Sequence, residues 1–164
     1  MWRAMTTSDL ASVNRIAAVV HPDYPEDAAI FSERLALYPA GCRVLDAPDG
    51  SLAGYVVSHP WRDREPPALN TRLGALPARP STYYIHDIAL LPEARGGKAA
   101  TKVVTALMEH ARATGFAAIS LVTVNDSEAF WRRMGFARVD DASLDAKLRS
   151  YDNNACFMEC DLAK

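Results

Sequence analysis

The sequence predicts a single α/β domain built on a mixed sheet with helices on both faces, and three observations support this. The chain has 164 residues, of which 49% are hydrophobic, so it can bury one core of the usual domain size. Two predicted strands follow each other without an intervening helix, which is inconsistent with a regular strand–helix alternation. No repeat, low-complexity segment or linker divides the chain, so one domain is expected over residues 1–164.

The first part of the chain predicts a strand, two helices and a hairpin. Residues 2–5 form the strand, and residues 6–20 form a helix that begins on a threonine-serine cap and carries apolar residues at helical spacing. Residues 25–38 form a second helix with Pro25 near its first turn. Residues 42–60 form two strands around the turn APDG.

The middle of the chain predicts a long loop followed by a parallel crossover. Residues 61–81 are rich in proline and lack periodicity, and a loop of this length in a compact domain is often functional. Strand 82–90, helix 97–114 and strand 118–124 form one right-handed crossover, with Gly115 as the helix C-cap. The remaining elements are a short helix over 127–135, a strand over 136–139, a polar connector over 140–154 and a final strand over 155–162.

The charge balance excludes some classes of partner. The 18 basic and 20 acidic residues leave a net charge of −2, whereas non-specific nucleic-acid binding normally requires a basic face. The N-terminus has no signal-peptide core and no apolar run approaches membrane-spanning length. We therefore expect no nucleic-acid or membrane partner and a cytoplasmic protein.

Cysteine usage agrees with a reducing compartment. The three cysteines are few and odd in number. Cys156 and Cys160 lie four residues apart on a predicted strand, about 13 Å at 3.3 Å per residue, which is too far for a disulfide. No histidine pair accompanies them at zinc spacing, so we interpret them as small buried hydrophobes and expect no metal site.

The stretch PEARGGKAATKVV, residues 92–104, has the form of a phosphate-binding turn at the start of a helix. The first turn of a helix presents unpaired N–H groups and the positive end of its dipole. Gly96 and Gly97 permit close approach of a ligand, while Arg95 and the hydroxyl of Thr101 add donors. The alternative is that the two glycines merely make a tight turn. The sequence matches neither the GxGxxG fingerprint nor the Walker loop.

The order of these pieces resembles the GNAT superfamily of N-acetyltransferases, which use acetyl-CoA. The family carries Arg/Gln-x-x-Gly-x-Gly/Ala at the start of its central helix, and ALLPEARGGKAAT matches it at Arg95, Ala100 and Thr101 but departs from it at Lys98. Downstream, LVTVNDSEAFWRRMGFARV is similar to the family's strand, CoA-contacting loop and closing FYxxxGF element. The resemblance covers most of the chain and implies a mostly antiparallel sheet with one splayed parallel strand pair.

The resemblance also implies a CoA site. The turn and first helical residues would hold the pyrophosphate, the end of strand 82–90 would pair with the pantetheine arm, and Phe130 and Trp131 would combine CoA contact with core packing. Asn125 would reach the same arm, or be an ordinary turn residue. Lys98 should have a negative φ within the first helical turn, so it would incur no left-handed cost and could add a cation near the phosphates. The implied CoA-binding residues are Ile88, Ala89, Leu90, Arg95, Gly96, Gly97, Lys98, Ala99, Ala100, Thr101, Asn125, Phe130 and Trp131.

The implied catalytic residues are His86 and Asp87. Acetyl transfer to an amine needs the uncharged amine, and an alkylamine with a pKa near 10.4 is only about 0.1% neutral at pH 7, so a base is required. In related diamine and polyamine acetyltransferases an acidic pair falls at these positions. His86 would be the base, or alternatively a histidine satisfied by a backbone carbonyl. Asp87 is expected to point to the opposite face and to be structural.

Trp131 stands where the family usually has the tyrosine that protonates the leaving thiolate. Indole cannot serve as this acid, and loss of acid catalysis costs at most about 10²–10⁴ in rate. Water or Ser127 could substitute, and a backbone N–H near Leu90 would polarise the thioester carbonyl.

We therefore predict an acetyl-CoA-dependent N-acetyltransferase that acts on a primary amine of a small molecule. The alternatives are a catalytically weak or inactive CoA-binding module and a doubly wound nucleotide-binding domain, although no acidic residue ends the next strand at ribose distance. An apolar face suggests a homodimer. The acceptor would be cationic if the acid-rich segments HPDYPED and 140–154 line its site, or these could be solvated charges. Their acidic residues are Asp23, Glu26, Asp27, Asp140, Asp141 and Asp145.

Overall fold

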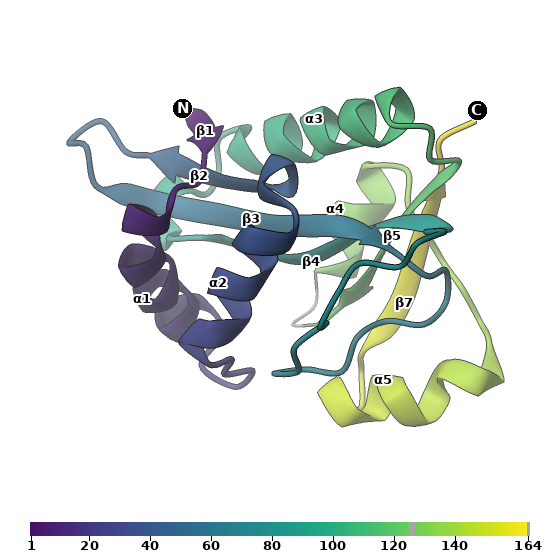
Figure 1. The fold of residues 1–164 in the computed structure, drawn as a ribbon. Coiled ribbons are helices and arrows are strands. Elements are labelled where there is room, and N and C mark those ends of the chain that lie inside the picture. The colour runs from purple at the N-terminus through teal and green to yellow at the C-terminus, as the bar shows by residue number, and fades with distance from the viewer. Residues whose placement is uncertain (125–126, 164) are drawn as a thin grey trace.

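The computed structural model describes residues 1–124 and 127–163, which form a seven-stranded mixed sheet in the order β1-β2-β3-β4-β5-β7-β6 (Figure 1). All neighbouring strands are antiparallel except β4 and β5, which are parallel. The strands are β1 (Trp2–Ala4), β2 (Cys42–Asp46), β3 (Leu52–Trp61), β4 (Thr82–Leu90), β5 (Ala118–Thr123), β6 (Ala137–Arg138) and β7 (Cys156–Asp161). The predicted mixed sheet with one parallel pair is confirmed.

Helices cover both faces of the sheet, as predicted (Figure 1). α1 and α2 pack with β2 and β3 on one face, where α5 also lies. α3 and α4 pack on the other face against β4, β5 and β7. The helices are α1 (Leu10–Val20), α2 (Ala28–Leu37), α3 (Ala99–Ala113), α4 (Glu128–Arg133) and α5 (Asp145–Tyr151), with short 3₁₀ turns at Thr7–Asp9, Pro39–Gly41, Pro92–Ala94 and Ala142–Leu144.

The beginning of α2 differs from the prediction. The helix begins at Ala28 with Asp27 as its N-cap, so Pro25 precedes the helix and does not lie in its first turn. Asp27 has extended backbone, with φ −64° and ψ 151°, and its N–H donates to the side chain of Asn70 at 2.7 Å. This hydrogen bond to the long loop takes the place of a first helical turn over residues 25–27.

The predicted polar connector over 140–154 contains a helix that the sequence pattern did not reveal. α5 and the 3₁₀ turn before it bury Leu144 and half-bury Leu148, which pack with Trp61 and Phe157. The apolar stripe consists of Leu144 and Leu148, four residues apart, and Tyr151 at the end of α5. The segment is too short and too polar for a clear helical period, and its packing partners come from distant strands.

The two central parallel strands separate along their length. β4 and β5 are paired only from Tyr83 with Ile119 to Ile85 with Leu121, although β4 continues to Leu90. Beyond Ile85, β4 is paired with β3 alone among the described residues. The splayed pair implied by the resemblance is therefore present, and it leaves one edge of β4 open.

A β-bulge lies on β4 at this point of separation. Val57 of β3 pairs with Asp87, whereas the next residue, Ser58, pairs with Ile85, so His86 is an extra residue in β4. A bulge interrupts the alternation of side chains between the two faces of a sheet. The orientations of His86 and Asp87 depend on this local geometry.

The cysteines are all buried and free, which confirms their interpretation as small buried hydrophobes. Across residues 1–124 and 127–163, no helix combines the length and the apolar character that crossing a membrane requires. The same residues contain no cluster of three or more histidine, cysteine or carboxylate side chains that could hold a metal ion.

Candidate active site

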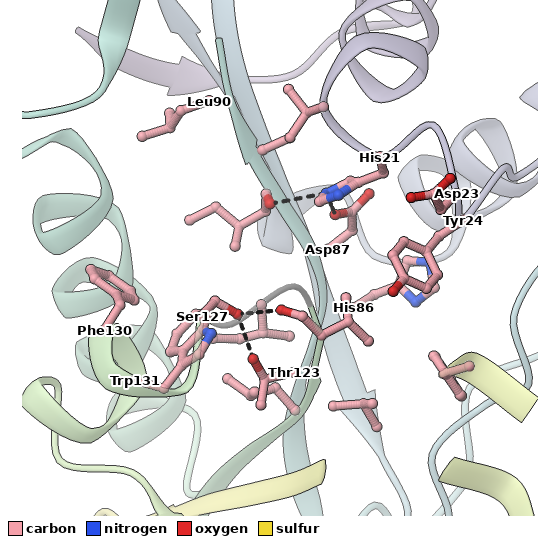
Figure 2. Close-up of a pocket in the computed structure, with 18 of the residues that line it drawn as sticks. His21, Asp23, Tyr24, His86, Asp87, Leu90, Thr123, Ser127, Phe130 and Trp131 are labelled. Carbon is pink, nitrogen blue, oxygen red and sulfur yellow. Dashed lines mark hydrogen bonds and ion pairs between the residues drawn. The ribbon is translucent and has the colours of Figure 1, made fainter. Parts of the chain in front are cut away.

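A cavity of about 640 Å³ opens where β4 and β5 separate (Figure 2). One side is formed by the α1–α2 connection, the floor by β4, and the other side by the end of β5 and by α4. Figure 2 shows His21, Asp23 and Tyr24 on one side of β4 and Phe130 and Trp131 on the other. The cavity thus joins the two segments that the sequence assigns to catalysis and to CoA.

The glycine-rich turn lies just before α3, which begins at Ala99, later than the predicted start at residue 97. Lys98 is the N-cap residue, with φ −106° and ψ 19°, so it pays no left-handed cost, although it does not lie in the first turn. Gly96 has φ +85°, a conformation that favours glycine. A Cβ added at Gly96 or Gly97 would meet no heavy atom within 4 Å, so the space above the turn is open to a ligand.

A second, smaller depression of about 330 Å³ lies against this turn. Arg95, Gly96, Gly97, Ala100 and Thr101 line it together with Arg133 of α4, a cation that the sequence interpretation missed. An arginine at the mouth of a helix N-terminus is suited to a phosphate, because dipole and charge act together. The arrangement fits the pyrophosphate of a nucleotide-containing cosubstrate.

The open edge of β4 connects this turn to the cavity. Ile88, Ala89 and Leu90 all line the cavity, and their pairing with β3 leaves the side toward β5 without a partner strand among the described residues. Arg95 donates from Nε to the carbonyl of Leu90 at 3.0 Å, which holds the turn against the strand end. An extended arm with amide groups could add to this edge as a strand does.

Phe130 and Trp131 have the dual position that the sequence predicted. Both line the cavity. Trp131 is also buried in the core, where its ring centroid lies 5.0 Å from that of Phe130 and 5.2 Å from that of Phe136. Asn125, the remaining predicted CoA contact, lies outside the described residues.

His86 forms a buried pair with a carboxylate. Its Nε2 lies 2.8 Å from Oε1 of Glu26, and the two side chains are only 3% and 5% exposed. The other oxygen of Glu26 accepts a hydrogen bond from the backbone N–H of Asn70 at 3.0 Å. Burial raises the pKa of the Glu26 carboxyl, but attraction to His86 and these hydrogen bonds outweigh it and leave the pKa below its ordinary value. The partner of His86 is therefore a carboxylate, not the backbone carbonyl considered from the sequence.

Asp87 points to the same side as His86, so the prediction that it faces the opposite side is wrong. Its Oδ1 lies 2.9 Å from Nε2 of His21, and its Oδ2 accepts a hydrogen bond from Tyr55 at 2.5 Å. His21 and Glu26 both belong to the α1–α2 connection. The bulge at His86 is the reason, because the extra residue cancels the alternation expected of a regular strand.

The directions of the pKa shifts in His21 and Asp87 indicate that the two side chains form an ion pair. Burial lowers the pKa of His21, but the hydrogen bond to Asp87 and the attraction of its charge outweigh burial, so the pKa is raised overall. The same contacts hold the pKa of Asp87 below its ordinary value against the opposing effect of burial. His21 Nε2 also lies 3.4 Å from the carbonyl of Ile88. The sequence analysis assigned no role to His21. Its place in the acid-rich segment HPDYPE, which also contains Glu26, could have indicated that it lies at the site.

The acid-rich segments contribute less than the sequence suggested. Asp23 and Glu26 line the cavity, but Asp140, Asp141 and Asp145 do not. Asp140 is 92% exposed, and Asp141 accepts from the backbone and side chain of Ser143. For residues 140–145 the alternative of solvated loop charges therefore fits the structure better.

Two hydroxyl groups lie near Trp131, one from Thr123 at the end of β5 and one from Ser127 just before α4. Ser127 donates to the carbonyl of Val124 at 2.8 Å, and its oxygen lies 2.5 Å from Oγ1 of Thr123 (Figure 2). Ser127 and Thr123 line the cavity beside Trp131. The cavity therefore holds hydroxyl donors on the side opposite to His86.

Fold and cavity together define an acyltransferase-like architecture, in which an open strand edge connects a glycine-rich turn to a buried histidine–carboxylate pair. The chain belongs to the acetyltransferase (GNAT) family, whose model matches residues 7–136. The resemblance to the GNAT superfamily that the sequence indicated is confirmed. No curated protein matches the chain in sequence.

Solved structures of low sequence identity share the fold over nearly the whole chain. A GNAT-like decarboxylase, GphF, in complex with isobutyryl-CoA is 15% identical, with 99% of each chain covered and a TM-score of 0.81. Ard1 from Thermoplasma volcanium is 17% identical, with 97% of this chain and 95% of that chain covered and a TM-score of 0.72. A putative phosphinothricin N-acetyltransferase is 14% identical, with 100% and 99% covered and a TM-score of 0.69.

Proposed function

We propose that the protein is an acetyl-CoA-dependent N-acyltransferase that moves an acetyl group to a primary amine of a small molecule. The observation that carries the proposal is the single cavity that reaches from Arg95 and Ala100, at the phosphate-binding turn, to the buried pair His86–Glu26. Membership of the acetyltransferase family supports the reaction class. The structural neighbour bound to isobutyryl-CoA supports a CoA thioester as cosubstrate.

The chain offers a separate group for each part of the cosubstrate. The amides at the start of α3, with Lys98 and Arg133 nearby, would hold the pyrophosphate. The open edge of β4 from Ile88 to Leu90 would pair with the pantetheine arm. When bound, acetyl-CoA supplies an activated acetyl group as a thioester. A backbone N–H near Leu90 would polarise its carbonyl.

His86 is the proposed base and would accept the proton of the amine. With its Nε2–H donated to Glu26, the lone pair is on Nδ1, which is buried and has no hydrogen-bond partner among the described residues. The Glu26 carboxylate then stabilises the imidazolium that forms, as a buried counter-charge. Asn70 holds the second oxygen of Glu26 and so fixes the orientation of the pair.

A second candidate is a CoA-binding module with weak or no transferase activity. Trp131 favours it, because the indole stands where the family's acidic tyrosine is usual and cannot donate a proton to a thiolate. The hydroxyl group of Ser127 argues for activity, since it lines the cavity and could turn from the carbonyl of Val124 to a leaving sulfur.

Calorimetry followed by an activity assay tests both candidates. Acetyl-CoA should bind one-to-one with a Kd on the order of micromolar, and NAD, the control ligand, should release no heat. Thiol release should then depend on an added amine. Binding without amine-dependent thiol release would favour the inactive module, and no binding of acetyl-CoA would overturn the proposed function.

A further inference from the structure

The end of the cavity beyond His86 is walled by apolar and aromatic side chains. Tyr24, Leu69 and Tyr151, which line the cavity, belong to this end. Tyr24 donates its hydroxyl proton to Asp152 at 2.5 Å, and Tyr151 donates to the carbonyl of Pro67. Because both hydroxyl groups are engaged with the wall, the rings are what these tyrosines offer to a ligand.

Four hydrogen bonds tie the walls of this end together. Asn70 binds both Glu26 and Asp27, which holds the long loop against the α1–α2 connection. Tyr24 with Asp152 ties the same connection to the segment after α5, and Tyr151 ties α5 to Pro67 of the loop. A polypeptide acceptor would have to extend past these contacts, whereas a compact molecule would fit within them.

The charges at this end favour a cation over an anion. Asp23 is exposed at the cavity and has no ion-pair partner among the described residues, while Glu26 and Asp87 are paired with histidines. Arg34, which lies behind this wall, has a side chain that is 0% exposed and is bonded to Glu33 and to the carbonyl of Thr71. Arg95, the arginine that lines the cavity, lies at the opposite, phosphate-binding end. A carboxylate on the acceptor would therefore find no unpaired cation at this end among residues 1–124 and 127–163.

We propose that the acceptor is a primary amine on a compact apolar or aromatic body that carries no carboxylate; this rests on the proposed function and names its substrate class. The ammonium form is attracted by Asp23 and by the ring of Tyr24, while the body packs against Leu69 and Tyr151. The amine then gives a proton to His86. The nitrogen of the neutral amine then forms the C–N bond as the C–S bond of the thioester breaks. The second proton that this nitrogen loses passes through water to the leaving thiolate.

Matched acceptors test this class with acetyl-CoA held constant. 2-Phenylethylamine and phenylalanine share a ring and an amine, but only phenylalanine carries a carboxylate. We expect kcat/KM for 2-phenylethylamine to exceed that for phenylalanine by about 100-fold, because an unpaired carboxylate loses its hydration at this end of the cavity. It should also exceed the values for spermidine and for a tetrapeptide with a free N-terminus.

Each other result has a definite meaning. Equal or better turnover of phenylalanine, spermidine or the peptide would overturn the proposed class. If none of the amines is acetylated although acetyl-CoA binds, the substrate class is overturned while the CoA site stands. If acetyl-CoA does not bind, the proposed function fails and this inference with it.

Two variants of Tyr24 locate the effect in its ring. Tyr24→Leu removes the ring, whereas Tyr24→Phe keeps it and removes only the hydroxyl that binds Asp152. We expect the KM for 2-phenylethylamine to rise about 10-fold more in Tyr24→Leu than in Tyr24→Phe. The KM for acetyl-CoA should change by less than about two-fold in either variant and reports on folding. Equal effects of the two substitutions would contradict a role for the ring.

Discussion

His86 and Glu26, sixty positions apart in the chain, meet side chain to side chain, with Nε2 of the histidine 2.8 Å from Oε1 of the carboxylate. Both side chains are nearly excluded from solvent. The hydrogen bond between them therefore offsets the free-energy cost of burying each polar group. This contact unites the α1–α2 connection with the bulged position of β4. It gives the proposed base a counter-charge that the strand alone does not supply.

Glu26→Gln keeps the shape of the side chain but removes its charge. We expect kcat to fall by about 10²–10⁴, the usual contribution of acid–base catalysis. Asp27→Asn, a change at the neighbouring carboxylate that does not line the cavity, is the matched control. An unchanged kcat in Glu26→Gln would show that the pair is structural.

Asn70 is expected to act as a positioning residue for Glu26. Its φ is +55°, a left-handed conformation that asparagine tolerates and alanine adopts at a cost of about 1–2 kcal/mol. Asn70→Ala should therefore lower both Tm and kcat more than Asn70→Gly, which keeps the left-handed backbone and the N–H donated to Glu26. Thermal unfolding and steady-state kinetics check this. Equal losses in the two variants would mean that the backbone conformation is unimportant.

Lys98 is expected to strengthen CoA binding. Since its φ is −106°, the lysine pays no conformational penalty, and a charge-assisted bond to phosphate contributes about 1.5–3 kcal/mol. Lys98→Ala should weaken binding about 10-fold or more in low salt, with a smaller effect in high salt because of screening. Calorimetry with CoA measures this, and Lys102→Ala, at an exposed position further along α3, is the control. Tighter binding by Lys98→Ala would show that the lysine obstructs the site.

The ion pair between His21 and Asp87 should make stability depend on pH. The pKa of His21 is raised above its ordinary value of 6.5. The stabilisation that His21 adds to the folded protein is therefore complete below pH 6.5, and it is lost as the pH rises through the pKa of His21 in the folded state. The pKa of Asp87 is lowered below its ordinary value of 3.8. The stabilisation that Asp87 adds is therefore complete above pH 3.8, and it is lost as the pH falls through the pKa of Asp87 in the folded state. The pair therefore stabilises the fold most between these two values.

His21→Gln tests this dependence. The loss in free energy of unfolding, about 1–3 kcal/mol for a buried charged hydrogen bond, should be greatest near pH 5 and smaller at pH 9. Denaturant unfolding of both proteins across this range measures the difference. A difference that does not vary with pH would show that the histidine is neutral in the folded protein.

Ser127 is expected to assist departure of the thiolate. Ser127→Ala should lower kcat by about 10-fold, toward the low end of acid catalysis, and leave the KM for acetyl-CoA nearly unchanged. Thr123→Val should have a smaller effect, because Thr123 also lines the cavity but acts here by hydrogen bonding to the Ser127 oxygen. Steady-state kinetics with acetyl-CoA and the preferred amine measures kcat and KM for both variants. A rise in KM without loss of kcat would instead assign Ser127 to binding.

The sequence by itself determined the strands, the parallel crossover and the position of the glycine-rich turn. These features are encoded locally: apolar periodicity marks the helices and strands, and Gly96 and Gly115, with φ of +85° and +93°, lie at the two ends of α3. The turn before α3 could be placed within a few residues because glycines, an arginine and a hydroxyl recur within one short stretch.

Only the tertiary structure decided the partners in the site. His21 and Glu26 approach β4 from a connection more than fifty residues away in sequence, and no local pattern records such a contact. The side of the sheet to which Asp87 points depends on a bulge, which arises from the pairing of β4 with β3 and not from either strand alone. α5 likewise depends on Trp61 and Phe157, distant residues that supply the apolar surface its two leucines need.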